Sequence, residues 1–312
     1  MSTGSRGENA LVRWLQARLA ADPRRVPIGI GDDMAAVRLD GRLVAMTTDM
    51  LLDGVHFETG RHSYAQIGRK AIACSLSDCA GMACEPRVAT VSVALNEAMS
   101  LFDVQQLYEG MVGIAQEFGC FIVGGDTTSW RHPLAIDVAM LAEPMAPRGP
   151  LTRSGAQVGD VVYVSGPLGG SLAGKHLAFT PRLELARRLA SRDDVHALMD
   201  ISDGLAMDLD RLCEASGCGA RLDQPMLATV VSDAAKTQAE ADEMPPIAHA
   251  LGDGEDFELL VVGCQTLEEA GLELRSVGRV VAAEPSCGAR VAMVDASGRE
   301  RPIEPRGFEH FR

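Results

Sequence analysis

The sequence predicts two domains that each mix α-helices with β-strands, a fold of the α+β or α/β class. The chain has 312 residues, which is long for one hydrophobic core and sufficient for two. Helix-like and strand-like segments occur along the whole length, with no short internal repeat. Proline and glycine are concentrated in residues 144–160. We therefore place the boundary near residue 147, between a domain of residues 1–147 and one of residues 148–312.

The first domain is expected to contain three helices and four strands. Apolar residues at helical spacing indicate the helices, and Gly119 ends the last of them. The helices are predicted over 8–20, 63–83 and 101–119. The strands are predicted over 43–51, 87–95, 121–129 and 134–143. Thr47, Thr48 and Asp49 are expected at the end of the first strand, and the third strand is expected to be short and buried and to break into a glycine loop.

The second domain is expected to contain at least four strands and two helices. Short runs rich in valine and leucine have the composition of buried strands. The strands are predicted over 161–166, 257–263, 276–281 and 289–295. The helices are predicted over 181–191 and 203–216.

Composition and charge exclude several classes of function. A hydrophobic fraction of 46% and a charged fraction of 23% are typical of a globular protein. The net charge of −14 argues against binding to nucleic acid or an anionic membrane surface, because both require a basic face. The chain starts without the apolar core of a signal peptide, and no apolar run approaches the length of a membrane span. The eight cysteines include no C-x-x-C pair, so we expect reduced thiols in a cytoplasmic protein.

One segment comes close to a phosphate-binding loop. In GGSLAGKH, Gly169, Gly174 and Lys175 satisfy the spacing G-x-x-x-x-G-K, but His176 stands where a hydroxyl residue should bind Mg²⁺. Glycines that form a tight turn between a strand and a helix explain this segment more simply. We therefore reject a phosphate-binding loop here.

Aspartates crowd the stretch MDISDGLAMDLD, and two interpretations of it are open. Asp203 or Ser202 could cap the following helix, with Asp208 and Asp210 on the solvated helix face. This interpretation leaves Asp200 unexplained, because it stands before the cap beside an apolar residue. The alternative is that the carboxylates hold cations. The stretch alone favours neither interpretation.

Other acidic residues stand at the ends of apolar segments or inside one. Asp78 lies within an apolar helix, where an unpaired carboxylate would be costly. Further acids occur in GIGDDMAAV (29–37), TTDMLLDGVHF (47–57), VGGDTTS (123–129) and GDGEDFELL (252–260). A solvated acidic surface would instead scatter its charges along polar faces. The combination favours carboxylates that converge on Mg²⁺, which prefers oxygen ligands and often binds together with substrate phosphates.

These motifs, in this order, resemble those of the thiamine-monophosphate kinases. The resemblance rests on GIGDDMAAV, TTDMLLDGVHF, GRKAIACSLSDCAGMACEPR, VGGDTTS, LTRSGAQVGDVVYVSG, MDISDGLAMDL and GDGEDFEL, and it extends from about residue 28 to the terminal GFEHF. That family belongs to a wider group with the aminoimidazole ribonucleotide synthetase (PurM-like) fold. The resemblance implies an N-terminal α+β domain that dimerises through its sheet and binds ATP and Mg²⁺, and a C-terminal α/β domain that closes over the nucleotide.

The resemblance also implies roles for individual residues, none of them catalytic beyond the ligands of metal and ATP. Several Mg²⁺ ions would be bound by Asp32, Thr47, Thr48, Asp49, Asp78, Asp126, Asp200 and Asp203. ATP would contact Tyr108, Gly125, Asp126, Arg153 and Ser202. Thiamine monophosphate would contact His56, Glu255 and Phe308. The chain departs from the family pattern GGEDYEL at Asp253 and Phe257, and its segment between Lys175 and Asp200 is short.

The implied reaction is direct in-line transfer of the γ-phosphoryl group of ATP to thiamine monophosphate, giving thiamine diphosphate. Such transfers depend on positioning and on neutralising charge with Mg²⁺, and a phosphate acceptor needs no strong base. The expected partners are ATP, thiamine monophosphate and a second copy of the chain in a homodimer, without nucleic acid or membrane. Two alternatives stay open. One is another ATP-using enzyme of the fold group, such as a selenophosphate or aminoimidazole ribonucleotide synthetase; the other is a non-catalytic nucleotide-binding dimer. The first cysteine, Cys74, lies inside a predicted helix, which counts against the selenium enzyme.

Overall fold

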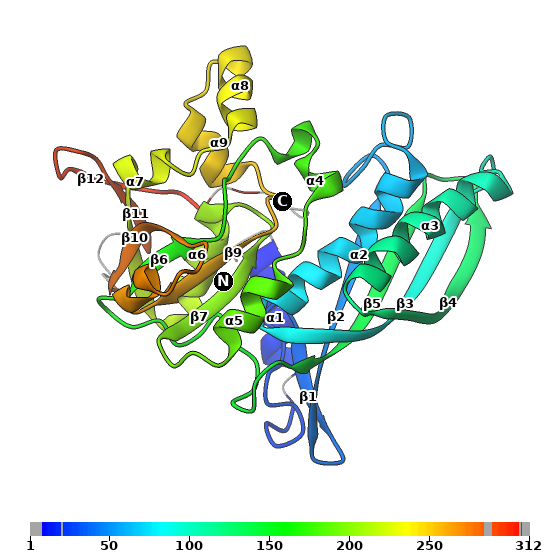
Figure 1. Cartoon of the computed structure of the whole chain (residues 1–312), viewed down its shortest axis with the longest axis horizontal. Helices are drawn as coiled ribbons and strands as arrows, with labels where there is room; N and C mark the ends of the chain where they lie inside the picture. Colours follow the sequence, from blue (N-terminus) through cyan, green and yellow to red (C-terminus); the bar gives the residue numbers. More distant parts are fainter. Residues whose placement is uncertain (1–7, 20, 284–288, 306, 308–312) are drawn as a thin grey trace, which may run out of the picture.

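The computed structural model describes residues 8–19, 21–283, 289–305 and 307, and it contains two β-sheets (Figure 1). The first sheet is formed by strands of the first half of the chain and the second sheet by strands of the second half. Helix α2 (Tyr64–Gly81) contacts strands of both sheets and therefore joins the two halves. This position explains why most residues of α2 are buried.

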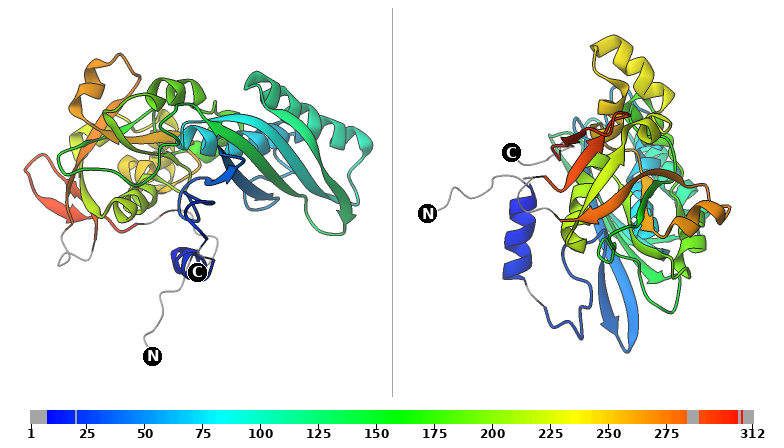
Figure 2. Two further views of the ribbon diagram at one scale, coloured as in Figure 1. Left: turned by 90° about the horizontal axis from the view of Figure 1, so that it is seen from below. Right: turned by 90° about the vertical axis from the view of Figure 1, so that its left-hand side faces the viewer.

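The first sheet has the strand order β1–β2–β5–β3–β4. Its neighbours are antiparallel except β3 and β4, which are parallel. The strands are β1 (Ala35–Leu39), β2 (Arg42–Leu52), β3 (Cys84–Asn96), β4 (Phe121–Trp130) and β5 (Ala135–Pro144). Helices α2 and α3 (Leu101–Glu117) pack together along one face of this sheet (Figure 2). Each of the two helices begins with a capping box, at Ser63 and at Ser100.

Two features of the first sheet differ from the sequence expectation. Strand β2 continues past Thr47 and Asp49, so these residues lie in the middle of the strand rather than at its end. Strand β4 is neither short nor buried: it is a ten-residue strand at the sheet edge, and nine of its residues are exposed. The glycines do not interrupt β4, because Gly125 lets it approach β3 closely. A Cβ at Gly125 would lie 1.8 Å from the carbonyl oxygen of Val91.

The second sheet has the order β12–β11–β8–β10–β6–β9–β7 and is mostly antiparallel, with β8 and β11 parallel. Its strands are β6 (Val161–Val164), β7 (Val195–Ile201), β8 (Cys218–Asp223), β9 (Glu258–Gly263), β10 (Arg275–Ala282), β11 (Val291–Val294) and β12 (Glu300–Pro302). Its helices are α4 (Lys175–Ala178), α5 (Leu183–Ala190), α6 (Leu205–Ser216), α7 (Gln224–Ala228), α8 (Asp233–Asp242) and α9 (Pro246–Gly252). Helix α1 (Glu8–Arg18) precedes both sheets.

The hydrophobic core extends across the junction of the two halves. One cluster of buried residues includes Ile72 and Leu76 of α2 together with Tyr163, Leu198 and Val261 of the second sheet. A second cluster covers the other face of the second sheet and includes residues of α6. The seven cysteines of the described chain form no disulfide. In the same part of the chain, no helix combines the length and the apolar character needed to cross a membrane.

Candidate active site

A cavity of about 280 Å³ lies where the two halves of the chain meet. The first half contributes residues of β2, the following loop and α2, and the second half contributes the end of β7 and the loop before β9. Eight residues predicted from the sequence line this cavity: Thr48, Asp49, His56, Asp78, Asp200, Ser202, Asp203 and Glu255. The fold therefore gathers acids from segments that are far apart in the sequence.

Three aspartates at the cavity accept hydrogen bonds from neutral hydroxyl groups. Thr47 Oγ1 donates to Asp78 (2.5 Å), Ser75 Oγ donates to Asp49 (2.5 Å), and Ser77 Oγ donates to Asp200 (2.6 Å). In a strand, alternate side chains point to opposite faces, so Thr47 and Asp49 of β2 both point toward α2. The hydroxyl of Thr48 points to the other face, where it donates to Asp137 (3.2 Å).

Burial and mutual repulsion raise the pKa values of these carboxyl groups. Loss of hydration is the largest cause for each of the three: it raises the pKa of Asp49 to about 6, and it raises the pKa values of Asp78 and Asp200 well above their ordinary range. For Asp78, the next causes are the negative charges of Asp49 and Asp200. Carboxylates that face one another inside a protein need a compensating positive charge when they ionise. A cation with oxygen ligands, such as Mg²⁺, would supply it.

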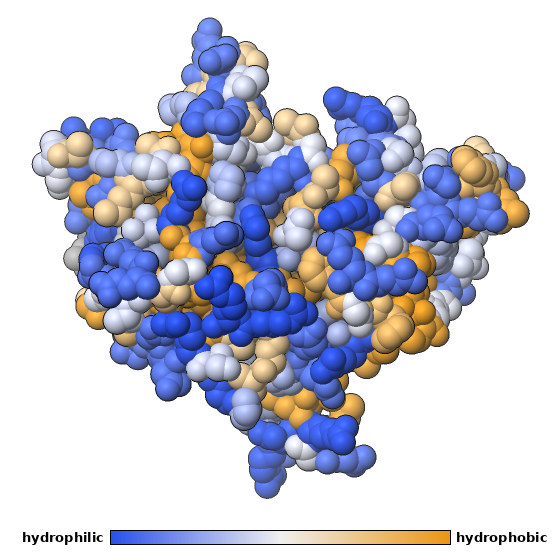
Figure 3. Space-filling model, in the orientation of Figure 1, coloured by the Kyte–Doolittle hydropathy of each residue, from blue (hydrophilic) through white to orange (hydrophobic). Residues whose placement is uncertain are grey.

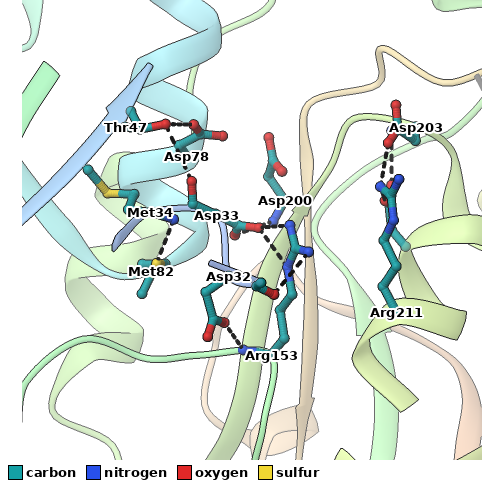
Figure 4. A network of polar contacts seen from close by, with 12 residues as sticks. Asp32, Asp33, Met34, Thr47, Asp78, Met82, Arg153, Asp200, Asp203 and Arg211 are labelled. Carbon is teal, nitrogen blue, oxygen red and sulfur yellow. Dashed lines mark hydrogen bonds and ion pairs between the residues drawn. The ribbon is translucent and has the colours of Figure 1, made fainter. Parts of the chain in front are cut away.

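A fourth aspartate, Asp33, belongs to the same acidic group (Figure 4). Its side chain is only 1% exposed and pairs with the Arg153 guanidinium, whose Nη2 lies 2.6 Å from Oδ1. Its other oxygen, Oδ2, accepts a bond from the Asp200 backbone N–H (3.3 Å). A Cβ at Gly81 would lie 2.2 Å from Asp33 Oδ2, so this glycine makes room for the carboxylate. The preceding residue, Asp32, accepts a bond from the Arg153 backbone N–H (2.7 Å).

A second cavity, of about 510 Å³, lies beside the first. Ser202 and Asp203 line both cavities, and Asp32, Arg153 and Arg211 line only the second. Helix α1 forms another part of its wall. The two cavities thus share part of their lining, and the second cavity brings arginines close to the acids.

A buried cation fixes the loop before β9 to the first half of the chain. Lys70 of α2 is fully buried, and its Nζ donates to both oxygens of Glu255 (2.7 and 2.8 Å) and to the His56 carbonyl oxygen (2.5 Å). His176 Nδ1 also lies 3.0 Å from Glu255. Burial raises the pKa of Glu255, but the contacts with His176 and Lys70 outweigh it and lower this pKa. Glu255 and Phe257 both have positive φ values (53° and 51°), which are unusual outside glycine and are held here by the surrounding contacts.

Comparison with known proteins identifies the family. The model of the AIR synthase related protein N-terminal domain matches residues 31–143, and that of the C-terminal domain matches residues 157–286. A thiamine-monophosphate kinase from Rhodopirellula baltica is 39% identical over 97% of both chains. The chain belongs to the thiamine-monophosphate kinase family. The Escherichia coli thiamine-monophosphate kinase is 30% identical over 98% of both chains. A solved structure described as AaThiL complexed with AMPPCP and TMP is 29% identical, with a TM-score of 0.84, and the match covers 98% of this chain and 97% of that one.

One expectation about the aspartate-rich stretch is wrong in this thiamine-monophosphate kinase family member. Asp208 does not lie on a solvated helix face: it is fully buried and accepts the backbone N–H groups of Asp203 (3.0 Å) and Gly204 (3.1 Å). It also pairs with Arg211 (3.2 Å), which in turn pairs with Asp203. Helix α6 begins after Gly204 and has no side-chain cap. Asp210 is also mostly buried, with an exposure of 8%. The stretch is thus a packed polar turn at the cavity.

Four predicted site residues do not line either of the two cavities. Gly125 and Asp126 lie on the exposed edge strand β4, and Tyr108 of α3 packs against the first core cluster. Thr47 contributes through its bond to Asp78 rather than as a lining residue. A fifth residue, Phe308, falls outside the described residues. The roles that the family resemblance implies for these five residues, and for the residues that line the cavities, stay predictions.

In the remaining motif, GGSLAGKH, Lys175 is already paired within the protein and is not available to bind a phosphate. Lys175 Nζ contacts the Pro167 carbonyl oxygen (3.0 Å) and the Glu258 carboxylate (2.9 Å). His176 is buried against Lys70 and Glu255. Sequence reasoning missed Asp33, Lys70 and His176 as members of the site. Asp33 adjoins a predicted ligand, and Lys70 stands in the quoted family motif, but their burial and pairing depend on contacts between the two halves.

Proposed function

We propose that this chain transfers the γ-phosphoryl group of ATP to the phosphate of thiamine monophosphate, forming thiamine diphosphate and ADP. The observation that carries the proposal is full-length similarity to thiamine-monophosphate kinases, with 39% identity over 97% of the chain. The acid-lined cavity supports it, because both substrates are anions and their repulsion must be neutralised before in-line attack. The acceptor is already an ionised phosphate, so the chain needs no strong general base.

The acidic residues of the cavity fit Mg²⁺. Asp49, Asp78 and Asp200 are acids whose ionisation the protein itself disfavours, and each is held in place by a hydroxyl group. Among the described residues, no three carboxylates of this cavity have ligand oxygens that all lie within 4.8 Å of one another. This spacing suits ions that are also bound by substrate phosphates better than one ion enclosed by protein. Bound Mg²⁺ would supply the positive charge for phosphoryl transfer.

The other polar residues position the substrates and the protein loops. Arg153 holds Asp32 and Asp33 from the second half of the chain, so the glycine turn that carries these acids stays against the cavity. We assign the second cavity to the nucleotide; Asp203, which lines both cavities, pairs there with Arg211. Lys70 and His176 keep Glu255 ionised and oriented toward the cavity that we assign to the acceptor.

We further propose a cytoplasmic homodimer with an N-terminal domain of residues 1–147 and a C-terminal domain of residues 148–312. Exposed apolar side chains on the first sheet support dimerisation through that sheet, including Met46, Met50, Phe121, Val123 and Leu141. Figure 3 views the first half of the chain from the side of α2 and α3, where apolar surface is also visible as orange areas; the open face of the sheet lies on the far side. A second copy on this sheet would cover the open edge of β4. It would also bring Gly125 and Asp126 into an interface, which would explain why they lie away from the cavities of a single chain.

An acceptor screen tests the proposed reaction. Purified protein is incubated with ATP and Mg²⁺ and with thiamine monophosphate, thiamine, aminoimidazole precursors or selenide, and ADP and the phosphorylated product are quantified by chromatography. We expect thiamine diphosphate from thiamine monophosphate and little turnover of free thiamine. Equal turnover of free thiamine, or preference for another acceptor, would favour a different enzyme of the fold group. ATP binding without turnover of any acceptor would favour the non-catalytic dimer.

A further inference from the structure

Three side chains with acid–base and nucleophilic chemistry meet at one end of the second sheet. Asp160 immediately precedes β6, His196 is the second residue of β7, and Cys264 immediately follows β9. Strand β9 lies between β6 and β7 and is antiparallel to both, so the three residues come to the same end of neighbouring strands. Asp200 lies toward the other end of β7. The group is therefore separate from the proposed kinase site, and none of its members lines either of the cavities assigned there.

The three side chains are arranged as a relay. His196 Nδ1 lies 2.8 Å from Asp160 Oδ2, and His196 Nε2 lies 3.8 Å from Cys264 Sγ. A carboxylate can only accept, so Nδ1 carries the proton, and Nε2 of the neutral ring is left as an acceptor for the thiol. The backbone N–H of Gln157 donates to the same Asp160 oxygen (2.7 Å) and fixes the carboxylate. A nucleophile, a base within reach of it and a third group that orients the base are the features of an activated nucleophile.

The backbone around Cys264 is fixed as well. Its N–H donates to the Asp194 carbonyl oxygen (2.9 Å), and its carbonyl oxygen accepts a bond from the Tyr163 hydroxyl (3.1 Å). The backbone that carries the thiol is thus held by neighbouring residues of the sheet. His196 also lines an open cavity of about 340 Å³, and its side chain is 16% exposed. The relay consequently lies at the protein surface.

Exposure separates Cys264 from the other cysteines of the described chain. Cys74, Cys79, Cys84, Cys120, Cys213 and Cys218 are buried, and Cys264 is half-buried. Burial raises the pKa values of the Cys79 and Cys84 thiols, for example, and keeps them protonated. Cys218 has Cys213 as its hydrogen-bonding partner. Among the cysteines that the structure describes, Cys264 therefore combines access to solvent with a neighbouring base.

We propose that Cys264 is a nucleophilic modification site that takes low-molecular-weight disulfides, with His196 as its base and Asp160 as the group that orients the base. The Cys264 proton passes to His196 Nε2 as the sulfur attacks one sulfur of the disulfide. A new S–S bond forms to Cys264, the old S–S bond breaks, and the departing thiolate leaves with its electron pair and takes the proton from His196. Cys264 is oxidised and the departing sulfur is reduced, so no further oxidant is required.

Reaction with an aromatic disulfide, dithiobis(nitrobenzoate), tests the proposal in the native full-length protein. Release of the coloured thiolate gives the rate, and peptide mapping identifies the modified cysteine and separates Cys264 from Cys218. We expect one fast-reacting thiol, which Cys264→Ser removes. His196→Gln should slow modification of Cys264 by about tenfold or more, and Asp160→Asn should slow it in the same direction. Thr266→Ala is the matched control: it alters the same turn, by removing a bond to Asp194 (2.7 Å), but leaves the relay intact and should react as the wild type does.

Three results would overturn the proposal. The first is modification of Cys264 only after denaturation, and the second is an unchanged rate in folded His196→Gln and Asp160→Asn proteins. If one of these variants fails to fold, the other decides, with melting temperature as the check. The third is stoichiometric zinc in the purified protein that is lost in Cys264→Ser, because thiolate, imidazole and carboxylate are also zinc ligands and the group would then be a metal site.

Discussion

Substitution of Asp200 by asparagine should separate a metal-binding carboxylate from a structural one. Asp200 is 2% exposed and lies between Ser77, which donates to it, and the carboxylate of Asp33. Asparagine keeps the size of the side chain and an oxygen that can accept the Ser77 hydroxyl, but it removes the charge. If the charge serves the fold, its loss should destabilise the protein. If the charge serves a cation, its loss should stabilise the metal-free protein and abolish turnover.

The size of the stabilisation follows from the local charges. Two unit charges about 4 Å apart repel each other by about 4 kcal/mol at an effective dielectric constant of about 20. After burial, the negative charge of Asp33 is the largest cause that raises the pKa of Asp200, so the two carboxylates repel each other. Arg153 pairs with Asp33 and offsets part of the repulsion. We therefore expect Asp200→Asn to stabilise the metal-free protein at pH 8 by about 1 to 2 kcal/mol, which corresponds to about 2 to 8 °C in Tm.

The assay combines calorimetry without metal and kcat measured over a Mg²⁺ titration. We expect kcat to fall by about a hundredfold or more, as for removal of another group that stabilises developing charge, with partial recovery at high Mg²⁺. Asp193→Asn is the control, because the Asp193 side chain is fully exposed and its ion pair with Arg148 is long, at 3.9 Å. It should leave both Tm and kcat nearly unchanged. A lower Tm with normal turnover in Asp200→Asn would refute the metal-binding role.

Three further predictions follow from the buried charges. Asp208→Ala should lower the free energy of unfolding by about 1 to 3 kcal/mol in urea titrations, because it removes the acceptor of two backbone N–H groups, those of Asp203 and Gly204; an unchanged midpoint would contradict this. The pKa values of Asp49 and Asp208 are raised, to about 6 and about 7. Their protonated forms therefore contribute stability to the metal-free protein. This contribution is fully present below the ordinary pKa of 3.8 and is lost as the pH rises through the raised values. Metal-free Tm should therefore fall from about pH 5 to about pH 8, and the increase in Tm on adding Mg²⁺ should grow over the same range; a constant increase would exclude carboxylates of raised pKa from the metal site. Lys70→Met should destabilise the fold by about 3 to 5 kcal/mol, because it leaves the partly buried Glu255 without its lysine. The double variant Lys70→Met/Glu255→Gln should recover most of this stability but retain a raised KM for thiamine monophosphate, and recovery of KM as well would remove Glu255 from the acceptor site.

The sequence predicted those elements whose patterns depend on local structure. Helix α3 alternates apolar and polar faces and begins at a capping box, and it was expected over 101–119 and found over Leu101–Glu117. Strand β7 was not predicted, because six of its seven residues are buried and no alternation marks it. Strand β4 was predicted in the right place but with the wrong exposure. Whether a strand lies at the edge of a sheet depends on pairing partners that its own residues do not specify.

The candidate site shows the same division between local and distant information. The motifs carrying Asp49, Asp78 and Asp200 could be recognised one by one, and the fold brings all three to one cavity. Asp208 was expected on the solvent-exposed face of its helix. Helical spacing shows which side chains share a face of the helix, but it does not show which face is buried. Which side is covered depends here on Arg211 and on the turn that carries Asp203. Contacts between the two halves of the chain therefore could not be predicted from local sequence patterns and are known only from the structure.

Those crossing contacts explain why binding and the arrangement of the two halves should be coupled. Ser77 donates to Asp200, Lys70 pairs with Glu255, and Asp33 pairs with Arg153, and each of these bonds joins one half of the chain to the other at the cavities. The carboxylates that repel one another also come from both halves, so ionisation without a cation strains this same junction. A cation shared by Asp78 and Asp200 would relieve the repulsion and strengthen the junction in one step. Substrate phosphates that bind through such cations would therefore contact both halves, and the groups that neutralise charge for phosphoryl transfer would also hold the two domains in position.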